Sequence, residues 1–319
     1  MKLKVIELRT GKSFNKAPFD QCVVTIGNFD GVHRGHQELL RLACDQAQKK
    51  KIASVALTFW PHPQEVLLGE DFQRLFGQEE LIDKFARLGV EYLVIVNFTK
   101  ELSQILPEEF YQDYLVKPLN PRTIVVGYNF RFGSKGAGDI KLLKALGEEE
   151  SRQVLIVEPF RVNDQVVSSS EIKLLLASGN LSYANELLGD EYFICGQVQR
   201  GQEKGRELGF PTLNLYPQHV IVPQRGVYIT TVEHSGKSYP SITNIGIRPT
   251  FYSNGQEVVE SHLLNENPNW YGQSIKVNFL EFLRSEKKFN GVDELLSQIH
   301  IDVKLASEYF RKYEMGSFS

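Results

Sequence analysis

The chain is poor in cysteine and has no long apolar run. Its 319 residues include three cysteines, Cys22, Cys44 and Cys195, which are far apart and form no CxxC pair. This usage is typical of a reducing compartment, with the cysteines buried as small apolar residues, and argues against a framework of disulfides. The apolar runs, such as YLVIV at 92–96, are far shorter than a membrane span of ~20 residues, and the first ten residues do not read as a signal peptide. These absences predict a soluble, cytoplasmic protein with no membrane partner.

The chain also lacks an excess of charge of either sign. Lysine and arginine total 36, aspartate and glutamate total 39, and the formal net charge is -3. Without a global basic field, nucleic acid is not an expected partner, and any anionic ligand must be held by local groups. Neither GxxxxGK(S/T) nor GxGxxG occurs, which removes support for a Walker-type or dinucleotide-fingerprint site. No feature marks an obligatory protein partner.

The sequence divides into two halves of different class, and 319 residues with 42% apolar content suffice for about two globular domains. From 21 to about 158, near-continuous apolar runs alternate with amphipathic helical stretches, a pattern typical of a doubly wound α/β fold with a parallel sheet. Helical stretches at 169–177 and 181–188 are expected to close this half, so the first domain is predicted over 1–189. Its ligand site should lie at the carboxyl ends of the strands.

After Gly189 and Asp190 the hydrophobic period changes from helical to alternating. About six short runs, separated by glycine, proline and asparagine, predict a small antiparallel β-barrel domain over 190–319. A last amphipathic stretch, 292–313, predicts a C-terminal helix packed against the barrel. Two halves of different class indicate two fused activities, or a catalyst joined to a binding module.

The first predicted strand, 22–29, runs into GNFDGVHRGHQELL, which combines glycines, two histidines and the start of a helix. The glycines let the backbone approach an anion, and the free amides of the first helical turn point at it. His33 and His36 can donate hydrogen bonds to phosphate oxygens whose charge grows in a phosphoryl-type transition state. The segment therefore predicts a phosphate site. Two alternatives stay open: a pair of surface histidines, and a zinc site, although no third ligand is evident nearby.

The second half contains a glycine-rich segment, GQEKGRELGFPTLNL at 201–215, that can fold over phosphates. Thr212 and Asn214 are two residues apart and face the same side of a strand, where their oxygens suit a nucleotide-bound Mg²⁺. The alternative is a purely structural role for Thr212. Glu260 lies in the apolar run VVESHLL and is either a general base beside a substrate hydroxyl or a carboxylate on the solvent face.

Eight motifs, in order along nearly the whole chain, resemble those of prokaryotic bifunctional FAD synthetases, which join a riboflavin kinase to an FMN adenylyltransferase of the HxGH nucleotidyltransferase type. They are GNFDGVHRGH (27–36), TFWPHP (58–63), GYNFRFGSKGAGD (127–139), SSSEIK (168–173), GQVQRGQEKGRELGFPTLNL (196–215), NIGIRPTF (244–251), ESHLL (260–264) and FLRSEKKF (282–289). The resemblance implies that the α/β half transfers AMP from ATP to FMN, and that the barrel half phosphorylates riboflavin to FMN with Mg²⁺ and ATP.

The resemblance also implies roles for individual residues. His33 and His36 would steady the α-phosphate region, and Glu260 would take the proton from the riboflavin 5′-hydroxyl. Thr212 and Asn214 would hold the metal. The flavin-binding candidates are Asn129 and Arg284, and the ATP- or phosphate-binding candidates are Gly27, Asn28, Phe29, Asp30, Gly31, Gly35, Ser168, Ser169, Lys173, Gly201, Gly205, Arg206, Pro211 and Asn214. Arg206, Arg248 and Arg284 are further candidates for phosphate-binding or loop-closing groups.

This sequence departs from the family's usual pattern at several positions. Lys173 replaces a usual arginine, Trp60 an acidic residue, and Asn129 and Asn265 an aspartate. Lysine supplies a point charge in place of a bidentate fork, so we expect a changed affinity or rate of adenylyl transfer and not its loss. Two rival interpretations remain: a single-activity riboflavin kinase with a non-catalytic nucleotidyltransferase-like domain, and a non-enzymatic flavin or nucleotide sensor.

Overall fold

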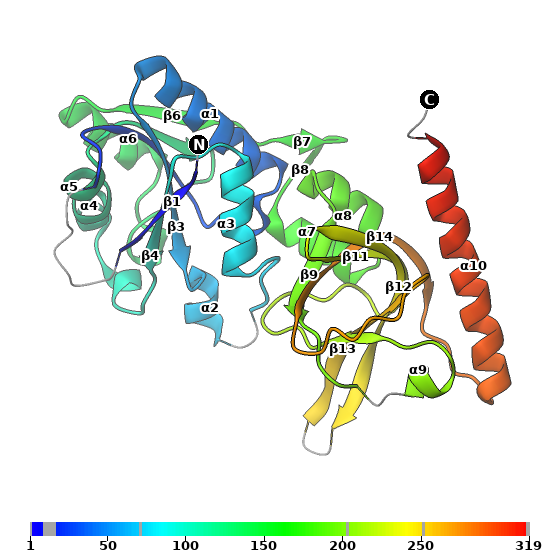
Figure 1. Ribbon diagram of the computed structural model, residues 1–319. Coiled ribbons are helices and arrows are strands. Elements are labelled where there is room, and N and C mark those ends of the chain that lie inside the picture. The colour runs from blue at the N-terminus through cyan, green and yellow to red at the C-terminus, as the bar shows by residue number, and fades with distance from the viewer. Residues whose placement is uncertain (1, 9–16, 70–71, 202–203, 251–252, 317–319) are drawn as a thin grey trace. The chain divides into compact units, whose positions relative to one another are not determined.

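The computed structural model describes residues 2–8, 17–69, 72–201, 204–250 and 253–316 (Figure 1). The chain forms two compact units, Met1–Ser169 and Ser170–Ser319. The first is an α/β unit and the second is built on an antiparallel sheet, as the change of hydrophobic period predicted.

The first unit contains a six-stranded parallel sheet in the order β1-β4-β3-β2-β5-β6. Its strands are β1 (Lys4–Leu8), β2 (Cys22–Ile26), β3 (Ala53–Trp60), β4 (Tyr92–Asn97), β5 (Pro121–Gly127) and β6 (Gln153–Val157). Five of them, β2 to β6, lie within the region 21 to about 158 in which apolar runs predicted a parallel sheet. The edge strand β1 was not predicted, because its half-exposed sequence KVIEL lacks the continuous apolar character of the others.

Helices cover both faces of this sheet, which explains why its strands are apolar without alternation. On one face, Val23 of β2 packs with Leu39, Ala43 and Ala47 of α1 (Arg34–Lys50). On the other face, Val24 belongs to the larger core cluster of the unit. The other described helices of this unit are α2 (Pro63–Leu68), α3 (Gln78–Arg87), α4 (Pro107–Phe110), a π-helical turn (Tyr111–Val116), α5 (Lys117–Leu119) and α6 (Ile140–Glu149). Short 3-10 turns lie at Asp30–Val32, Leu102–Gln104 and Ser134–Gly136. A small hairpin is formed by β7 (Arg161–Val162) and β8 (Gln165–Val166).

The strand order reverses at β2. From β2 the sheet grows through β3 and β4 on one side, whereas β5 and β6 lie on the other side. Ligands of open α/β sheets bind at such a switch point, outside the carboxyl ends of the strands. The segment 27–36 follows β2 and the segment 127–139 follows β5, so two of the predicted motifs leave the sheet at this point.

The second unit begins at Ser170, within α7 (Ser169–Ala177), and continues with α8 (Leu181–Leu188). The sequence predicted both helices as the end of the first domain. Asn185 of α8 explains their place, because its side chain donates to the carbonyl of Phe279 at 3.0 Å and accepts from the amide of Tyr192 at 2.8 Å. In addition, the amide of Gln224 donates to the carbonyl of Leu176. These contacts join both helices to the second unit, and the boundary of the functional domains at 189/190 stays a prediction.

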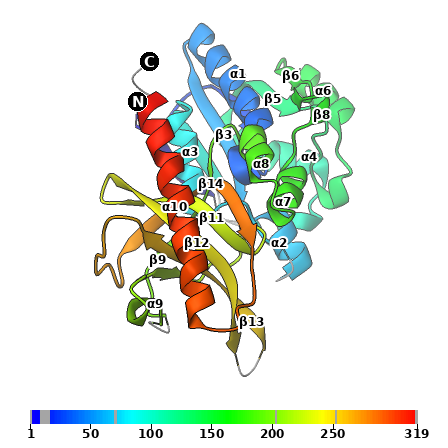
Figure 2. The same ribbon diagram turned by 90° about the vertical axis from the view of Figure 1, so that its right-hand side faces the viewer.

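The antiparallel sheet has the order β10-β13-β12-β11-β14-β9, and its two edges meet through a bond from the Gln199 amide to the Asn214 carbonyl at 2.9 Å, which closes the barrel. Its elements are β9 (Tyr192–Gln197), α9 (Lys204–Glu207), β10 (Leu213–Leu215), β11 (Gly226–His234), β12 (Lys237–Thr250), β13 (Ser253–Leu263) and β14 (Ser274–Ser285). The C-terminal helix α10 (Val292–Gly316) crosses the outside of the barrel, where Ala306 packs with Ile229 and Ile242 (Figure 2).

Candidate active sites

The first site is the loop that follows β2. Phe29 turns its ring into the core, because its backbone is left-handed with φ of 50° and its side chain is fully buried. A Cβ on Gly27 would lie 3.3 Å from that ring, so the glycine makes room for it. The hydroxyl of Thr58 donates to the carbonyl of Asn28 at 3.2 Å, which ties the loop to β3. The loop is thus a packed part of the unit.

Asp30 connects this loop to other parts of the first unit. Its side chain is 4% exposed, and its Oδ1 accepts from the amide of Leu75 at 2.8 Å. Its carbonyl accepts from the hydroxyl of Ser169 at 2.8 Å. Asp30 therefore holds Ser169 beside the histidine loop, although the two residues are far apart in the sequence.

The two histidines form one stacked unit. Their ring centroids are 3.6 Å apart with 17° between the planes, and His33 is 5% exposed. The Nδ1 of His33 accepts from the amide of His36 at 3.3 Å and so caps the start of α1. The Nδ1 of His36 is buried and has no hydrogen-bond partner among the described residues. The ring of His33 is therefore fixed at the start of α1, and the ring of His36 has a buried nitrogen that can bond to a ligand.

Burial keeps both imidazoles neutral. Desolvation lowers the pKa of His33 to about 4, against the opposing attraction of Asp30. Desolvation, with the neighbouring His33, also lowers the pKa of His36 well below its usual value. Each ring at neutral pH is then a donor of one N–H bond and not a cation. Such a pair can bind the oxygens of a phosphate through hydrogen bonds, without a positive charge on either ring.

The other residues predicted for this site come from several different elements. Asn129 is exposed just after β5. Lys173 lies on α7 within the second unit, and Ser168 immediately precedes that helix. Trp60, at the end of β3, carries the guanidinium of Arg74 at 4.4 Å from its ring centroid.

His62, within the PHP turn, is structural. Its Nδ1 accepts from the amide of Gln64 at 3.1 Å at the start of α2, and its ring stacks on Phe72 at 4.5 Å. Among the residues that the structure describes, no cluster of three or more His, Cys, Asp or Glu side chains could hold a metal ion. The zinc alternative therefore finds no support there.

The second site is a cavity of about 430 Å³ in the second unit. One row of directly opposed residues crosses five strands and lines it: Asn214 faces Glu260, Glu260 faces Asn244, Asn244 faces Val227, and Val227 faces Arg284. Opposed residues of paired strands project to the same face of a sheet. Glu260 is half-buried in the centre of this arrangement and lies on the cavity side, not on a solvent face.

Asn214 and Thr212 stand at one end of the row. Asn214 is 4% exposed, and its Nδ2 donates to the Thr212 carbonyl at 3.2 Å and to the Thr212 hydroxyl at 3.5 Å. Its Oδ1 is buried without a hydrogen-bond partner in the described part of the chain. A buried amide oxygen beside a hydroxyl is a donor set that fits Mg²⁺, which prefers oxygen ligands.

The glycine-rich segment packs directly on this end of the cavity. A Cβ on Gly201 would lie 2.7–2.9 Å from the amide group of Asn214, and one on Gly205 would lie 2.4 Å from the Phe210 carbonyl. The carbonyl of Pro211 accepts from His262 at 2.9 Å. Only glycine allows so close an approach. The side chains of Arg206 and Arg248, both predicted as phosphate or loop-closing groups, lie outside the described residues.

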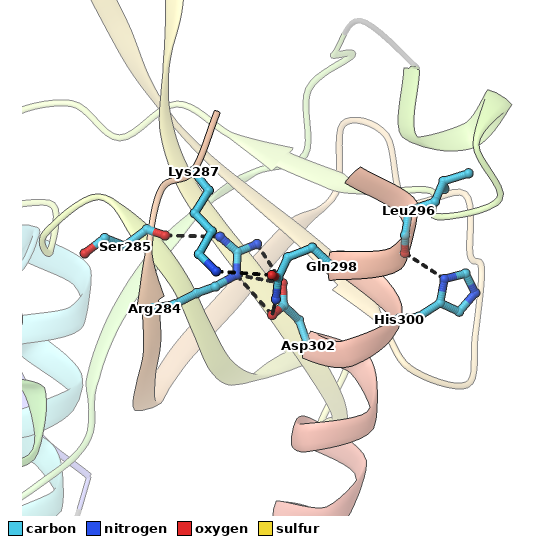
Figure 3. Close-up of polar contacts among 7 residues, drawn as sticks. All are labelled: Arg284, Ser285, Lys287, Leu296, Gln298, His300 and Asp302. Carbon is cyan, nitrogen blue, oxygen red and sulfur yellow. Dashed lines mark hydrogen bonds and ion pairs between the residues drawn. The ribbon is translucent and has the colours of Figure 1, made fainter. Parts of the chain in front are cut away.

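Arg284, at the other end of the row, is bonded to the C-terminal helix (Figure 3). Its Nε donates to both carboxylate oxygens of Asp302 at 3.0 Å, and its Nη2 donates to one of them at 2.7 Å. Gln298 also donates to Asp302 at 2.9 Å, and Lys287 donates to Gln298 at 3.3 Å. Asp302 and Gln298 were not among the predicted site residues. The sequence did offer one sign of a buried charge in α10, because Asp302 stands where the helical spacing of apolar residues predicts another apolar residue.

The fold and the two sites define a transferase that handles phosphate groups: an HxGH loop at the switch point of a parallel sheet, and a barrel cavity with a carboxylate beside a magnesium-type donor set. A FAD synthetase family model matches residues 15–171, and a riboflavin kinase family model matches 188–310. The chain belongs to the family of bifunctional riboflavin kinase/FMN adenylyltransferases. It phosphorylates riboflavin to FMN and transfers the adenylyl group of ATP to FMN, which gives FAD and pyrophosphate.

Relatives along the full length support this membership. The bifunctional riboflavin kinase/FMN adenylyltransferase of Bacillus subtilis (strain 168) is 35% identical over 97% of this chain and 98% of its own. That of Escherichia coli (strain K12) is 36% identical over 93% and 96%. A crystal structure described as a macrolide-efflux protein from Streptococcus pneumoniae shares the fold, with a TM-score of 0.86 and 30% identity over 95% of this chain and 98% of that one. In the described part of the present chain, no helix is both long and apolar enough to cross a membrane.

The neutral state of His33 makes the stability of the protein pH-dependent. Because the unfolded imidazole titrates near pH 6.5 and the folded one near about 4, the unfolded state binds a proton first as the pH falls. We expect His33 to contribute about 3 kcal/mol above pH ~6.5 that is lost progressively down to about pH 4. Thermal unfolding should therefore lose more stability between pH 7.5 and 4.5 in the wild type than in His33→Asn, which keeps a capping oxygen.

The matched control is His219→Asn at an exposed position with φ of 57°, which asparagine tolerates. It should follow the wild-type pH profile. Equal losses in wild type and His33→Asn would show that His33 is not held neutral by the fold.

Proposed function

We propose that the two reactions use the two sites separately, with adenylyl transfer in a domain over 1–189 and riboflavin phosphorylation in a domain over 190–319. The observation that carries this proposal is the row of opposed residues that sets Glu260 between Asn214 and Asn244 in a cavity of about 430 Å³. A cavity of this size suits a small-molecule substrate.

In the kinase site, Glu260 acts as general base. It accepts the proton of the riboflavin 5′-hydroxyl while that oxygen bonds to the γ-phosphorus of ATP, and the bond to the leaving ADP oxygen breaks. General-base assistance of this kind contributes about 10²–10⁴ in rate. Glycines 201 and 205 let the loop backbone approach the phosphates, and Arg206, whose side chain is outside the described residues, is the candidate cation of that loop.

Thr212 and Asn214 are the residues that would hold the Mg²⁺ of the nucleotide. The fit rests on the buried Oδ1 of Asn214, which has no hydrogen-bond partner in the described ranges, and on the adjacent hydroxyl. The bound ion would neutralise charge on the phosphates that are transferred and released. The protein's part is to hold both oxygens close together at the start of β10.

In the adenylyltransferase site, a phosphate oxygen of FMN bonds to the α-phosphorus of ATP, and pyrophosphate leaves. This nucleophile needs no general base, because a phosphate monoester has a second pKa of about 6 and is largely deprotonated at pH 7. Neutral His33 and His36 fit this requirement, since they donate hydrogen bonds to the α-phosphate oxygens as negative charge increases there.

Residues around the loop complete the adenylyltransferase site. The amides at the start of α1 add donors beside the histidines. We assign Ser168, Ser169 and Lys173 to the phosphates, and Asn129 to the flavin. Because Lys173 offers one point charge, we expect a weaker nucleotide affinity here than arginine would give.

The small-molecule partners in this proposal are riboflavin, FMN, FAD and ATP, and the location is the cytoplasm. A net charge of -3 offers no general attraction for nucleic acid. In a chromatographic time course with riboflavin, ATP and Mg²⁺, FMN should appear first and then decline as FAD rises. Accumulation of FMN without FAD would show that adenylyl transfer has been lost.

Single substitutions should separate the two activities. Glu260→Gln should lower FMN formation from riboflavin by about 10²-fold or more while FMN-to-FAD conversion stays within about twofold of the wild type. His36→Ala should lower FAD formation and leave FMN formation intact. Each reaction is measured alone, with purified full-length protein.

The matched control is Glu257→Gln on the same strand, because Glu257 is not among the residues that line the cavity. It should retain both activities. Loss of both activities in Glu260→Gln would contradict the two-site assignment, and normal FAD formation in His36→Ala would remove His36 from the mechanism.

A conservative pair tests the metal ligands. Thr212→Val has nearly the same shape as threonine but no hydroxyl, whereas Thr212→Ser keeps it. We expect Thr212→Val to weaken the binding of ADP in the presence of Mg²⁺ about tenfold, the size of one lost bond to a charged group, and Thr212→Ser to bind nearly as the wild type does. Calorimetry with and without Mg²⁺ measures this. An equal loss in both conditions would assign Thr212 to the nucleotide and not to the metal.

A further inference from the structure

Helix α10 is held on the barrel by two different kinds of contact. Its later turns belong to an apolar cluster in which Ala306 is fully buried against Ile229 and Ile242. Its earlier turns present Leu295, Ile299 and Asp302 to the cavity. Residues at this spacing lie on one face of a helix. The first half of α10 is therefore a wall of the kinase cavity, and the second half is its anchor.

The contact that sets the position of this wall is the forked pair of Arg284 and Asp302. Asp302 is 2% exposed, and the Arg284 side chain is 16% exposed. Three donor–acceptor contacts of 2.7–3.0 Å join the guanidinium to the carboxylate, and Gln298 adds a fourth to the same carboxylate (Figure 3). A planar fork against a carboxylate fixes direction as well as distance.

The same pair makes Arg284 a poor partner for a phosphate. To reach one, the guanidinium would have to leave Asp302, and a buried carboxylate without its partner is strongly unfavourable. The pair instead presents a compensated, neutral surface beside apolar side chains of the cavity such as Val227, Ile242 and Leu295. This end of the cavity therefore offers apolar surface to a planar group, with Glu286 and Lys287 as further charged residues of the lining.

We infer that Asp302, acting through Arg284, is a positioning residue for riboflavin: the pair holds the first half of α10 against the flavin pocket, so that substrate affinity depends on it and phosphoryl transfer does not. This inference rests on the proposed kinase site. It also changes the role of Arg284, which was predicted from the sequence as a direct flavin-binding residue, to that of a support for the wall.

The test compares full-length variants by KM and kcat for FMN formation, and by riboflavin binding measured from flavin fluorescence without ATP. Asp302→Asn removes the charge, and Arg284→Lys removes the fork. Each should raise the KM and the dissociation constant for riboflavin about tenfold or more and change kcat less than about threefold. The double variant Arg284→Met/Asp302→Leu replaces both charges by apolar groups of similar size and should recover most of the affinity, because neither charge is left unpaired.

The matched control is Glu308→Gln, which removes a carboxylate from an exposed position of the same helix and should behave as the wild type. FMN-to-FAD conversion should stay unchanged in every variant, and a cooperative thermal unfolding transition of the second unit reports that the barrel is folded. If Asp302→Asn fails to fold, the double variant decides: wild-type riboflavin affinity supports the inference, and tenfold weaker binding by a folded double variant overturns it.

Three other outcomes would also overturn the inference. They are a fall in kcat at unchanged KM in Asp302→Asn, unchanged affinity in both single variants, and equal losses in the single and double variants. Failure of the kinase assignment is distinguishable, since it would appear as FMN formation that does not depend on Glu260 while the binding measurement still reports the pair.

Discussion

The kinase half depends above all on the register of its antiparallel strands. Five residues from five strands, Asn214, Glu260, Asn244, Val227 and Arg284, reach one cavity only because each is directly opposed to the next. A slip of one residue in any pair would turn the side chains of that strand to the other face of the sheet. Three other features contact this row: the bond from Gln199 to Asn214, the glycine-rich segment 201–215 and the C-terminal helix α10. The site is therefore formed by the whole barrel and not by a single loop.

In the α/β half, the candidate phosphate site depends instead on the burial of two histidines. His33 and His36 are stacked and desolvated, so the loop after β2 offers neutral donors where two cations would repel each other. The barrel instead has a carboxylate in its cavity and a buried amide oxygen, that of Asn214, without a hydrogen-bond partner among the described residues, a donor set that fits a metal ion. Both arrangements fit a chain with net charge -3, because each anionic substrate meets local groups and no general positive field.

Much of this could be predicted from the sequence, because the relevant signals are local. The runs of β2 to β6 are apolar without alternation, which indicates a parallel sheet covered on both faces, and the later alternation indicates the barrel. The edge strand β1 was less accessible, since it is half-exposed. The contacts of Asn185 in α8 with Phe279 and Tyr192 were also not predictable, because they depend on the packing of the barrel. Asp302 carried only a weak signal, an acid at an apolar position.

The sequence by itself determined the two-domain class and the family, because short motifs and hydrophobic periods are properties of continuous stretches of the chain. The same motifs predict the two histidines, Thr212, Asn214 and Glu260 as site residues. Only the tertiary structure decided what each group can do. Burial sets the charge of His33 and His36, and strand register sets Glu260 directly between Asn214 and Asn244. The packing of α10 pairs Arg284 with Asp302. These properties arise from neighbours far apart in sequence, and a pKa or a free hydrogen-bonding oxygen exists only once those neighbours have excluded water.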